Sequence, residues 1–344
     1  MTEILNSYIT SNLIVVLLVT GGVALWRAIS RNKLWREAFR SVYRRRRIAV
    51  WVCAVYLAIG LSDSIAWVGG GQVGTDAVAR HEAKTLLDRA FGDKKEKSYS
   101  APFADAEFYA KSPLRFPGKH VLGTDILGRD VLFVTLKGVR IALLIGGLTT
   151  LIAIPLALLM GVLAGFFGKY VDDAVFFVFS VLQSMPSILL LIALITALPK
   201  STLSVCIALA VTSWVGFCRL SRGETMKLRE LDYVYAARAL GVSELRIIWR
   251  HILPNLTHLI VITFALTFSS QVLSEAVLAW LNIGVEGSWG QMIAQAKNEL
   301  SRDPVVWWNL AAASIALFGL ILAINLVGDA IRDVLDPRTA RENQ

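Results

Sequence analysis

The 344-residue chain is 55% hydrophobic, has a mean hydropathy of +0.58 and contains only 18% charged residues. This composition is too apolar for an ordinary soluble domain and indicates a protein of the lipid bilayer. The net charge of +9 does not indicate nucleic-acid binding, because the basic residues lie beside apolar runs and no nucleic-acid-binding motif is present. Cys53, Cys206 and Cys218 lie in or beside apolar segments without paired spacing, so neither a disulfide framework nor a metal site is indicated.

Residues 8–29 form the first apolar run, and a basic segment at 31–47 follows it. A cleaved signal peptide has the reverse charge order, so we expect an uncleaved span with its N-terminus outside and the basic segment in the cytoplasm. A helix on the membrane surface is the alternative, because Gly21 and Gly22 weaken the run. The run 48–68 then forms the next span, which leads outward.

A polar region at 69–130 follows, and a loop of this length is translocated largely regardless of its charge. It ends in HVLGTDILGRDVL, whose glycines allow tight turns and whose charged side chains can form charge-assisted hydrogen bonds. These residues are Gly123, Asp125, Gly128, Arg129 and Asp130. We expect them to form a structural clamp at the membrane surface rather than a set of catalytic acids, because the sequence shows no pocket or partner for chemistry.

Further apolar runs approach or exceed the ~20 residues that cross a bilayer. They are 139–165, 174–198, 201–218, 257–281 and 306–328. Counting alternations from the basic segment places the connection 218–256 in the cytoplasm, in agreement with its many arginines, and seven spans place the C-terminus inside. Residues 168–173 are predicted to form a short turn.

Two of these runs contain polar groups at membrane depth. The run 174–198 contains Gln183 and Ser184, and the run 257–281 contains Gln271, Ser274 and Glu275. Such groups usually face a bundle interior or a water-filled cavity, so a transport pathway is one hypothesis and helix–helix hydrogen bonding is the other. Later in the chain, Trp289, Trp307 and Trp308 suit the aromatic belt at a membrane interface.

The connection 218–256 contains a polar stretch with two predicted helices. One apolar face is expected from the spacing of Leu228, Leu231, Tyr235 and Ala239. Gly241 supplies a helix stop, and Ser243 is placed to cap the second helix. Pro254 closes that helix or opens the next one. An ordinary amphipathic surface helix is the alternative.

Four segments resemble binding-protein-dependent ABC permeases of the dipeptide, oligopeptide and nickel family, as the second of the two permeases. Residues 120–132 resemble the Gly-Thr-Asp-x-x-Gly-Arg-Asp signature, and residues 288–292 and 325–338 resemble the Ser-Trp-Gly-x-Met and closing motifs. The stretch 232–255 resembles the coupling loop, with the pattern Glu-Ala-Ala, three residues, Gly, nine residues, Ile-x-Leu-Pro. Ala236, Ala237, Gly241, Leu253 and Pro254 match this pattern, whereas Tyr235 and His251 replace its Glu and Ile.

The resemblance implies an all-α integral membrane fold, a MetI-like bundle of six core transmembrane helices, to which this chain adds an N-terminal span. Its expected parts are an N-terminal span with basic segment (1–47), a first core helix (48–68), an extracytoplasmic loop (69–130), a permease domain (131–331) and a cytoplasmic tail (332–344). The permease domain contains the coupling loop, defined as residues 218–256. In the family this loop receives movement from the ATPase, and Tyr235, Ala236, Ala237, Gly241, Ser243, Leu253 and Pro254 are its candidate residues.

The function implied is an importer subunit of the bacterial inner membrane that carries short peptides or a related solute. Its expected partners are a homologous permease, two ABC ATPase domains, an extracytoplasmic binding protein and membrane lipid, with no nucleic acid. The chain lacks a P-loop, an HExxH pair and a G-x-S-x-G elbow, so we expect neither a catalytic nor a metal site. ATP and Mg²⁺ would bind to a partner ATPase. The alternatives are a nickel or other small-solute importer, an ATP-independent channel or secondary transporter, and a membrane-embedded enzyme.

Overall fold

The computed structural model describes residues 40–67, 84–91, 95–96, 98–199 and 201–335. Contacts divide the chain into two compact units, the first comprising Met1–Leu143 with Ala279–Ala323 and the second Leu144–Leu278 with Ile324–Gln344. The predicted N-terminal span at 8–29 and most of the predicted cytoplasmic tail lie outside the described residues.

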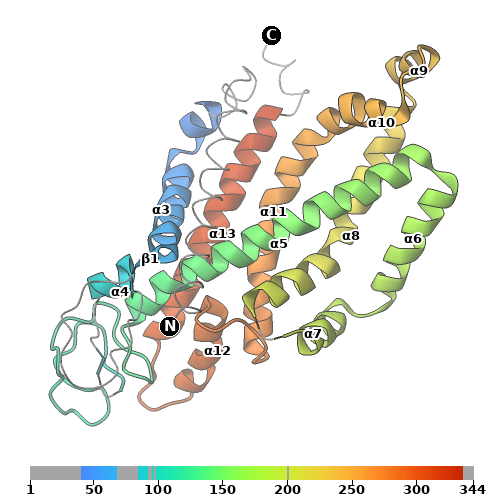
Figure 1. The fold of residues 1–344 in the computed structure, drawn as a ribbon. Helices are drawn as coiled ribbons and strands as arrows, with labels where there is room; N and C mark the ends of the chain where they lie inside the picture. Colours follow the sequence, from blue (N-terminus) through green and yellow to red (C-terminus); the bar gives the residue numbers. More distant parts are fainter. Residues whose placement is uncertain (1–39, 68–83, 92–94, 97, 200, 336–344) are drawn as a thin grey trace. The chain divides into compact units, whose positions relative to one another are not determined.

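The first unit consists of helices, two short strands and a long irregular segment that lies at one end of the helices (Figure 1). Its elements are α3 (Arg47–Ser64), β1 (Ala66–Trp67), β2 (Lys84–Thr85), α4 (Leu86–Phe91), the start of α5 (Val131–Phe167), α12 (Trp289–Leu300) and the start of α13 (Trp308–Leu335). The two short strands pair antiparallel, with Ala66 opposite Thr85. Residues 98–130, named here the clamp segment, contain turns and isolated bridges but no helix.

Two tryptophans of this unit are buried and donate hydrogen bonds to distant parts of the backbone. The sequence instead predicts that they lie in an aromatic belt at the membrane interface. Trp289 and Trp308 are each only 2% exposed. Trp289 Nε1 donates to the Thr135 carbonyl at 2.8 Å, and Trp308 Nε1 donates to the Thr124 carbonyl at 2.9 Å. Trp307 is exposed, as an interfacial residue would be. The belt prediction was therefore wrong for Trp289 and Trp308, because each indole N–H finds a backbone acceptor far away in the sequence.

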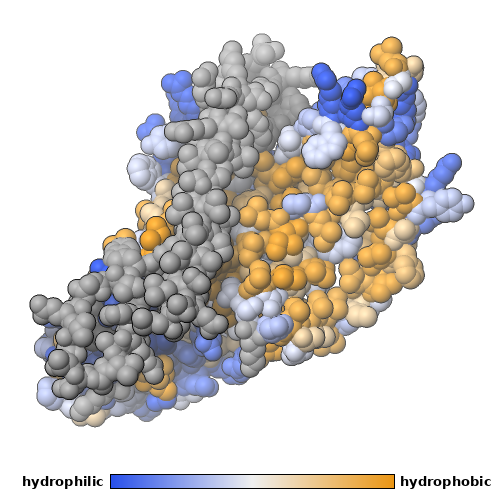
Figure 2. All heavy atoms as spheres, in the orientation of Figure 1, coloured by the Kyte–Doolittle hydropathy of each residue, from blue (hydrophilic) through white to orange (hydrophobic). Residues whose placement is uncertain are grey.

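The second unit contains the remaining helices. They are the rest of α5, then α6 (Lys169–Ser184), α7 (Ser187–Ala197), α8 (Thr202–Arg229), α9 (Asp232–Ala239), α10 (Glu244–Ile247), the π-helical turn η1 (Ile248–Ile252), α11 (Leu253–Trp280) and the end of α13. Hydrophobic side chains cover much of the face seen in Figure 2, and hydrophilic side chains gather near α9 and α10. This distribution fits helices that cross a bilayer and end in water.

Five described helices are long and apolar enough to cross a membrane, and a sixth span results if the bent pair α6–α7 is counted as one. These match the six predicted core spans, with one difference. The predicted span 174–198 is broken between Ser184 and Ser187, and its two helices meet at 91°. Pro186 lies at this break and has no N–H to continue the helix. The predicted turn 168–173 is also shorter, because α6 already begins at Lys169.

Candidate functional site

The coupling loop has the predicted helix–glycine–helix geometry. After α9, Gly241 adopts a φ of +77°, which glycine enters without steric cost. The Gly241 N–H donates to the Arg238 carbonyl at 2.9 Å, and the Val242 N–H donates to the Ala237 carbonyl at 3.1 Å. These bonds close α9 and direct the chain into α10. Residues 218–229 of the predicted loop belong to α8.

The buried face of α9 differs from the predicted one. Val234 and Ala237 are buried and belong to a cluster with Val162, Phe166 and other apolar residues. Leu231 and Tyr235, expected on the apolar face, are 43% and 49% exposed. The reason is that α8 ends at Arg229 and Leu231 is extended, with a φ of −83° and a ψ of 144°. This break shifts the helical phase, so the spacing from Leu228 does not continue into α9.

Several large apolar side chains of the loop remain uncovered in this chain. Leu240 is 84% exposed, Leu245 63% and Trp249 72%. Ala236 is exposed as well, whereas Ala237 is buried. Direct contact between Ala237 and an ATPase, as the resemblance implied, therefore does not fit the burial of this side chain. An apolar surface of this kind beside charged residues is typical of a protein contact site.

One local expectation for the loop was wrong and one was confirmed. Ser243 occupies the N-cap position of α10, but its side chain makes no capping hydrogen bond. Pro254 opens the next helix as predicted, because it is the second residue of α11, which begins at Leu253 and follows α10 and η1 without an intervening loop. The π-helical turn ends at Ile252, two residues before Pro254, and the Leu253 N–H donates to the Ile248 carbonyl. This wider turn accommodates the proline ring, which would clash in a regular α-helix.

Charged side chains link the loop at its surface. Tyr235, which stands in place of the family's glutamate, donates a hydrogen bond to Glu230. This bond, followed by the one from Arg229, holds the pKa of Glu230 below its usual range. Arg238 Nε lies 3.2 Å from Glu244 Oε1 and connects α9 to α10. These contacts are exposed, so they orient the loop without contributing much to stability.

Asp125 and Arg129 form charge-assisted hydrogen bonds, the type of contact that the sequence predicts for the clamp segment. Asp125 Oδ1 accepts from the backbone N–H groups of Leu127 and Arg129, each at 2.9 Å. Arg129 Nε donates to Asp125 Oδ2 at 2.8 Å. Gly128 has a φ of +70°, and a Cβ there would lie 2.6 Å from the Glu96 carbonyl carbon. A Cβ on Gly123, whose φ is +73°, would likewise meet backbone atoms of Ser100 and Ala101.

Asp130 fixes the start of α5. Its Oδ1 accepts from the Leu132 N–H at 2.8 Å and the Phe133 N–H at 3.2 Å, which caps the helix. Its Oδ2 lies 2.9 Å from Nδ1 of the buried His120, whose Nε2 lies 3.6 Å from Glu96 Oε1. Sequence reasoning missed His120 and Glu96 as parts of the clamp, although His120 directly precedes the signature.

A second buried carboxyl group was also missed. Glu299 of α12 accepts from Asn309 Nδ2 at 3.1 Å and from the Tyr99 hydroxyl at 3.3 Å. Burial raises the pKa of Glu299. Burial, followed by the charge of Glu299, raises the pKa of Tyr99 to about 12. No local motif surrounds these residues, so only the fold reveals the cluster.

The predicted pathway residues fall into two groups. Gln271 and Glu275 lie one turn apart on α11 and are buried, while Ser274 donates to the Ser270 carbonyl at 2.9 Å. Gln183 and Ser184 are exposed at the end of α6. Gln183 lines a cavity of about 410 Å³ at the α6–α7 break, together with Ser187 and Thr212.

Comparison with known proteins identifies the family. The family described as "Binding-protein-dependent transport system inner membrane component" matches residues 157–341. The chain belongs to this family. The oligopeptide transport system permease protein OppC of Bacillus subtilis is 33% identical over 64% of this chain and 72% of its own length. The glutathione transport system permease protein GsiD of Pectobacterium atrosepticum is 35% identical over 64% and 73%.

A third relative, the di/tripeptide transport system permease protein DppC of Pseudomonas aeruginosa, is 34% identical over 64% of this chain and 73% of its own length. Among solved structures, the chain is similar to one from the inward-facing MetNI methionine ABC transporter. That similarity has a TM-score of 0.49 and 18% identity, and it covers 60% of this chain and 98% of the other.

Family membership confirms the predicted all-α membrane fold of the MetI-like type and the multi-pass inner-membrane location. A permease of this family works with a substrate-binding protein and with an ATPase on a separate chain. Among the described residues of this permease, no group of three or more histidine, cysteine, aspartate or glutamate side chains could hold a metal ion.

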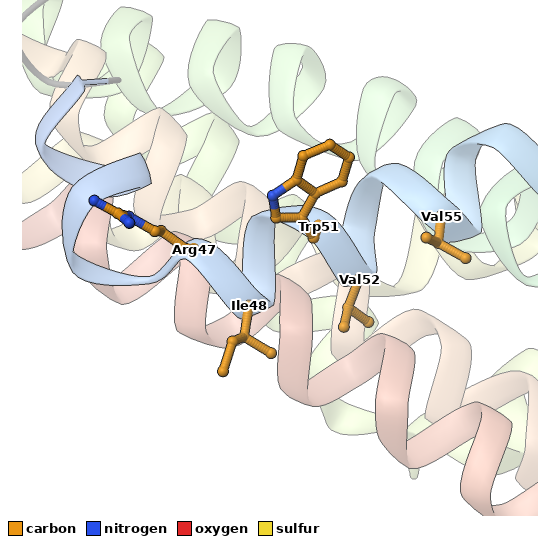
Figure 3. A pocket seen from close by; sticks show the side chains of 5 residues that line it. All are labelled: Arg47, Ile48, Trp51, Val52 and Val55. Atoms are coloured by element: carbon orange, nitrogen blue, oxygen red, sulfur yellow. The ribbon is translucent and has the colours of Figure 1, made fainter.

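An apolar hollow of about 510 Å³ lies along α3 (Figure 3). Arg47, Ile48, Trp51, Val52 and Val55 line it, and all come from the first turns of this one helix. Ile48 is 81% exposed and Trp51 61%. The helix is long and apolar enough to span a membrane, so the hollow lies on a surface that lipid or another helix can contact.

Proposed function

We propose that this permease forms one half of the membrane pathway of an ABC importer for short peptides. The proposal is supported by relatives named for oligopeptides, glutathione and di- or tripeptides, each 33–35% identical to this chain. Nickel chelates or another small solute are the alternative cargo. Uptake of a labelled dipeptide in competition with nickel distinguishes the two.

The coupling role, contact between this loop and an ATPase subunit, is supported by the exposed apolar surface of the loop. Leu240, Leu245 and Trp249 are left uncovered next to a glycine-linked helix pair. In the proposed mechanism, an ATPase subunit that binds ATP and Mg²⁺ covers this surface and moves it during the nucleotide cycle. Movement of the loop then shifts the adjoining spans and gives alternating access.

The proposed assembly is a heterodimer of this chain with a homologous permease, bound to two ATPase domains. The clamp segment would then lie on the extracytoplasmic side, where a binding protein delivers the cargo. Its internal ion pairs and glycine contacts support a role in holding a fixed surface there. Asp125, Arg129 and Asp130 would act structurally, since each is used in bonds within the segment.

The proposed pathway residues come from two helices. Helix α11 contributes Gln271, Ser274 and Glu275. The end of α6 contributes Gln183 and Ser184. Polar side chains at membrane depth are costly unless they serve packing or a pathway. Glu275→Gln is expected to lower uptake while leaving the purified complex intact. Unchanged uptake would remove Glu275 from the pathway.

The first experiment is purification of the tagged chain from native membranes in mild detergent, followed by mass spectrometry and an ATPase assay. Recovery of a second permease and P-loop ATPases, with hydrolysis stimulated by a binding protein, is the expected result. A lone chain without hydrolysis would favour a channel or secondary transporter.

The loop itself is tested by Leu240→Ser, which removes an exposed apolar side chain. We expect loss of ATPase co-purification and of coupled uptake. Leu203→Ser at the start of α8, where Leu203 is 54% exposed, is the matched control.

The turn between α9 and α10 is tested separately. Gly241→Pro should also uncouple hydrolysis from uptake, because proline fixes φ near −65° and cannot adopt the observed +77°. Normal coupled uptake by both loop variants would contradict the proposal.

A further inference from the structure

Helix α6 is held to the rest of the second unit by few buried side chains. Only Val175 and Phe179 of its sixteen residues are buried. The helix begins directly after Gly168 and ends at the α6–α7 break, where Gln183 lines the cavity. The position of α6 therefore sets one wall of this cavity.

Two arginines of α8 attach to α6 near its opposite ends. Arg222 donates from Nε to Asp172 Oδ1 at 2.5 Å and from Nη2 to Asp172 Oδ2 at 2.6 Å. Arg219 donates to the Gln183 side chain, and its guanidinium lies 4.8 Å from the Phe179 ring centroid. Arg219 and Arg222 are three residues apart and therefore share one face of α8. A bidentate pair such as Arg222–Asp172 fixes the relative orientation of the two side chains as well as the distance between them.

The same end of α8 is tightly joined to α5. A Cβ on Gly161 would lie 2.5 Å from the Cys218 carbonyl oxygen, and one on Gly165 would lie 2.6 Å from that of Arg222. Arg229 Nη1 donates to the Gly165 carbonyl at 2.9 Å, near the C-terminal end of α5. With backbones this close, the two helix ends move together.

The coupling loop packs against the same end of α5 that contacts α8. Val234 and Ala237 of α9 share a cluster with Val162 and Phe166 of α5. The Arg238 guanidinium also lies 5.1 Å from the Phe166 ring centroid. A displacement of α9 therefore reaches the end of α5, and through α5 the end of α8.

We propose that Arg222 and Asp172 are positioning residues that pass movement of the coupling loop to α6, and so to the wall of the cavity at the α6–α7 break. This inference rests on the proposed importer function. It adds a mechanical route inside the chain, from α9 through α5 and α8 to α6. Without the pair, α6 keeps its contacts at Phe179 and Gln183 but loses its fixed orientation at the other end.

The test uses the assembled transporter, reconstituted in liposomes with its ATPase and binding protein. Asp172→Asn and Arg222→Gln are measured singly and together, and the readout is labelled peptide imported per ATP hydrolysed. Coupling between distant sites typically corresponds to 5–150-fold, and we expect each single change to lower this ratio about tenfold. The double variant should be no worse than either single one, because both remove the same link.

Glu224→Gln is the matched control. Glu224 pairs with Lys227 at 2.7 Å on the same helix, but this pair makes no link to α6. The control should keep the wild-type ratio. Wild-type ratios in Asp172→Asn and Arg222→Gln, or losses that simply add in the double variant, would overturn the proposal.

The importer function is separately checked by Ala237→Trp, which disrupts the α9–α5 contact. If Ala237→Trp uncouples the transporter and Asp172→Asn does not, the loop functions but the Arg222–Asp172 link is wrong. If uptake in the wild type does not require ATP, the proposed function itself fails.

Discussion

The clamp segment and the coupling loop are both irregular connections with positive-φ glycines and ion pairs, yet they are stabilised differently. In the clamp segment, Thr124, Asp125 and His120 are buried and bonded within the chain. In the coupling loop, Leu240 and Trp249 are open to solvent, and the ion pairs lie at the surface. The clamp segment buries polar and charged side chains within the chain, whereas the coupling loop leaves large apolar side chains exposed.

The largest expected difference concerns their glycines. At Gly128 of the clamp segment, a Cβ would overlap the backbone of Glu96, and backbone atoms cannot move aside cheaply. We expect Gly128→Ala to cost several kcal/mol, about 3 or more, and to prevent the clamp segment from forming. Size-exclusion chromatography of detergent extracts should show little folded permease. A normal yield of monodisperse complex would show that this region is less rigid than its contacts indicate.

Next in size is the effect of removing a central charge from each region. Asp125→Ala removes the acceptor of two backbone N–H groups and of Arg129. Hydrogen bonds to a charged group suggest a loss of about 2 to 3 kcal/mol, which thermal unfolding can measure. Glu230→Ala in the coupling loop loses its contacts with Tyr235 and Arg229 at the surface and should leave the melting temperature unchanged. Equal shifts in both variants would remove the distinction between the regions.

Sequence reasoning predicted the features that depend on neighbouring residues. The six core spans, the stop at Gly241 and the use of Asp125, Arg129 and Asp130 in charge-assisted hydrogen bonds all follow from neighbouring residues. Sequence reasoning failed where a side chain finds its hydrogen-bond partner far away in the chain. Tyr99 bonds to Glu299 across 200 positions and Trp308 to Thr124 across 184, and no local pattern reports such contacts. The burial of Val234 in place of Tyr235 was also missed, because a break at Leu231 changes the helical phase without a glycine or proline to mark it.

A smaller effect is expected at Gly241 itself. Nothing lies within 4 Å of a Cβ built there, so alanine meets only the cost of the left-handed backbone. That cost is about 1 kcal/mol, and the connection between α9 and α10 should survive it. Gly241→Ala should therefore keep normal assembly and most coupled uptake, in contrast to Gly128→Ala. Complete loss of uptake would mean that the partner surface also approaches Gly241 closely.

The smallest expected effect is a pH dependence confined to the cluster beside the clamp segment. Because burial raises the pKa of Glu299, the folded state binds a proton more tightly than the unfolded state does. Stability should therefore fall as pH rises from the ordinary glutamate pKa of about 4.3 to the raised value, and stay constant above it. Tyr99, Asn309, Asp125 and Arg302 are the polar and charged groups that act on this carboxyl group.

Hydrogen exchange of residues 98–130, corrected for the intrinsic rate at each pH, measures this dependence locally. Protection should decrease through the window in the wild type and be flat in Glu299→Gln, which cannot ionise. The coupling loop provides the internal control, since the exposed Glu230 has its pKa lowered by Tyr235 and Arg229, and its contribution has the opposite sign. A wild-type slope that persists in Glu299→Gln would contradict the assignment of the pH dependence to Glu299.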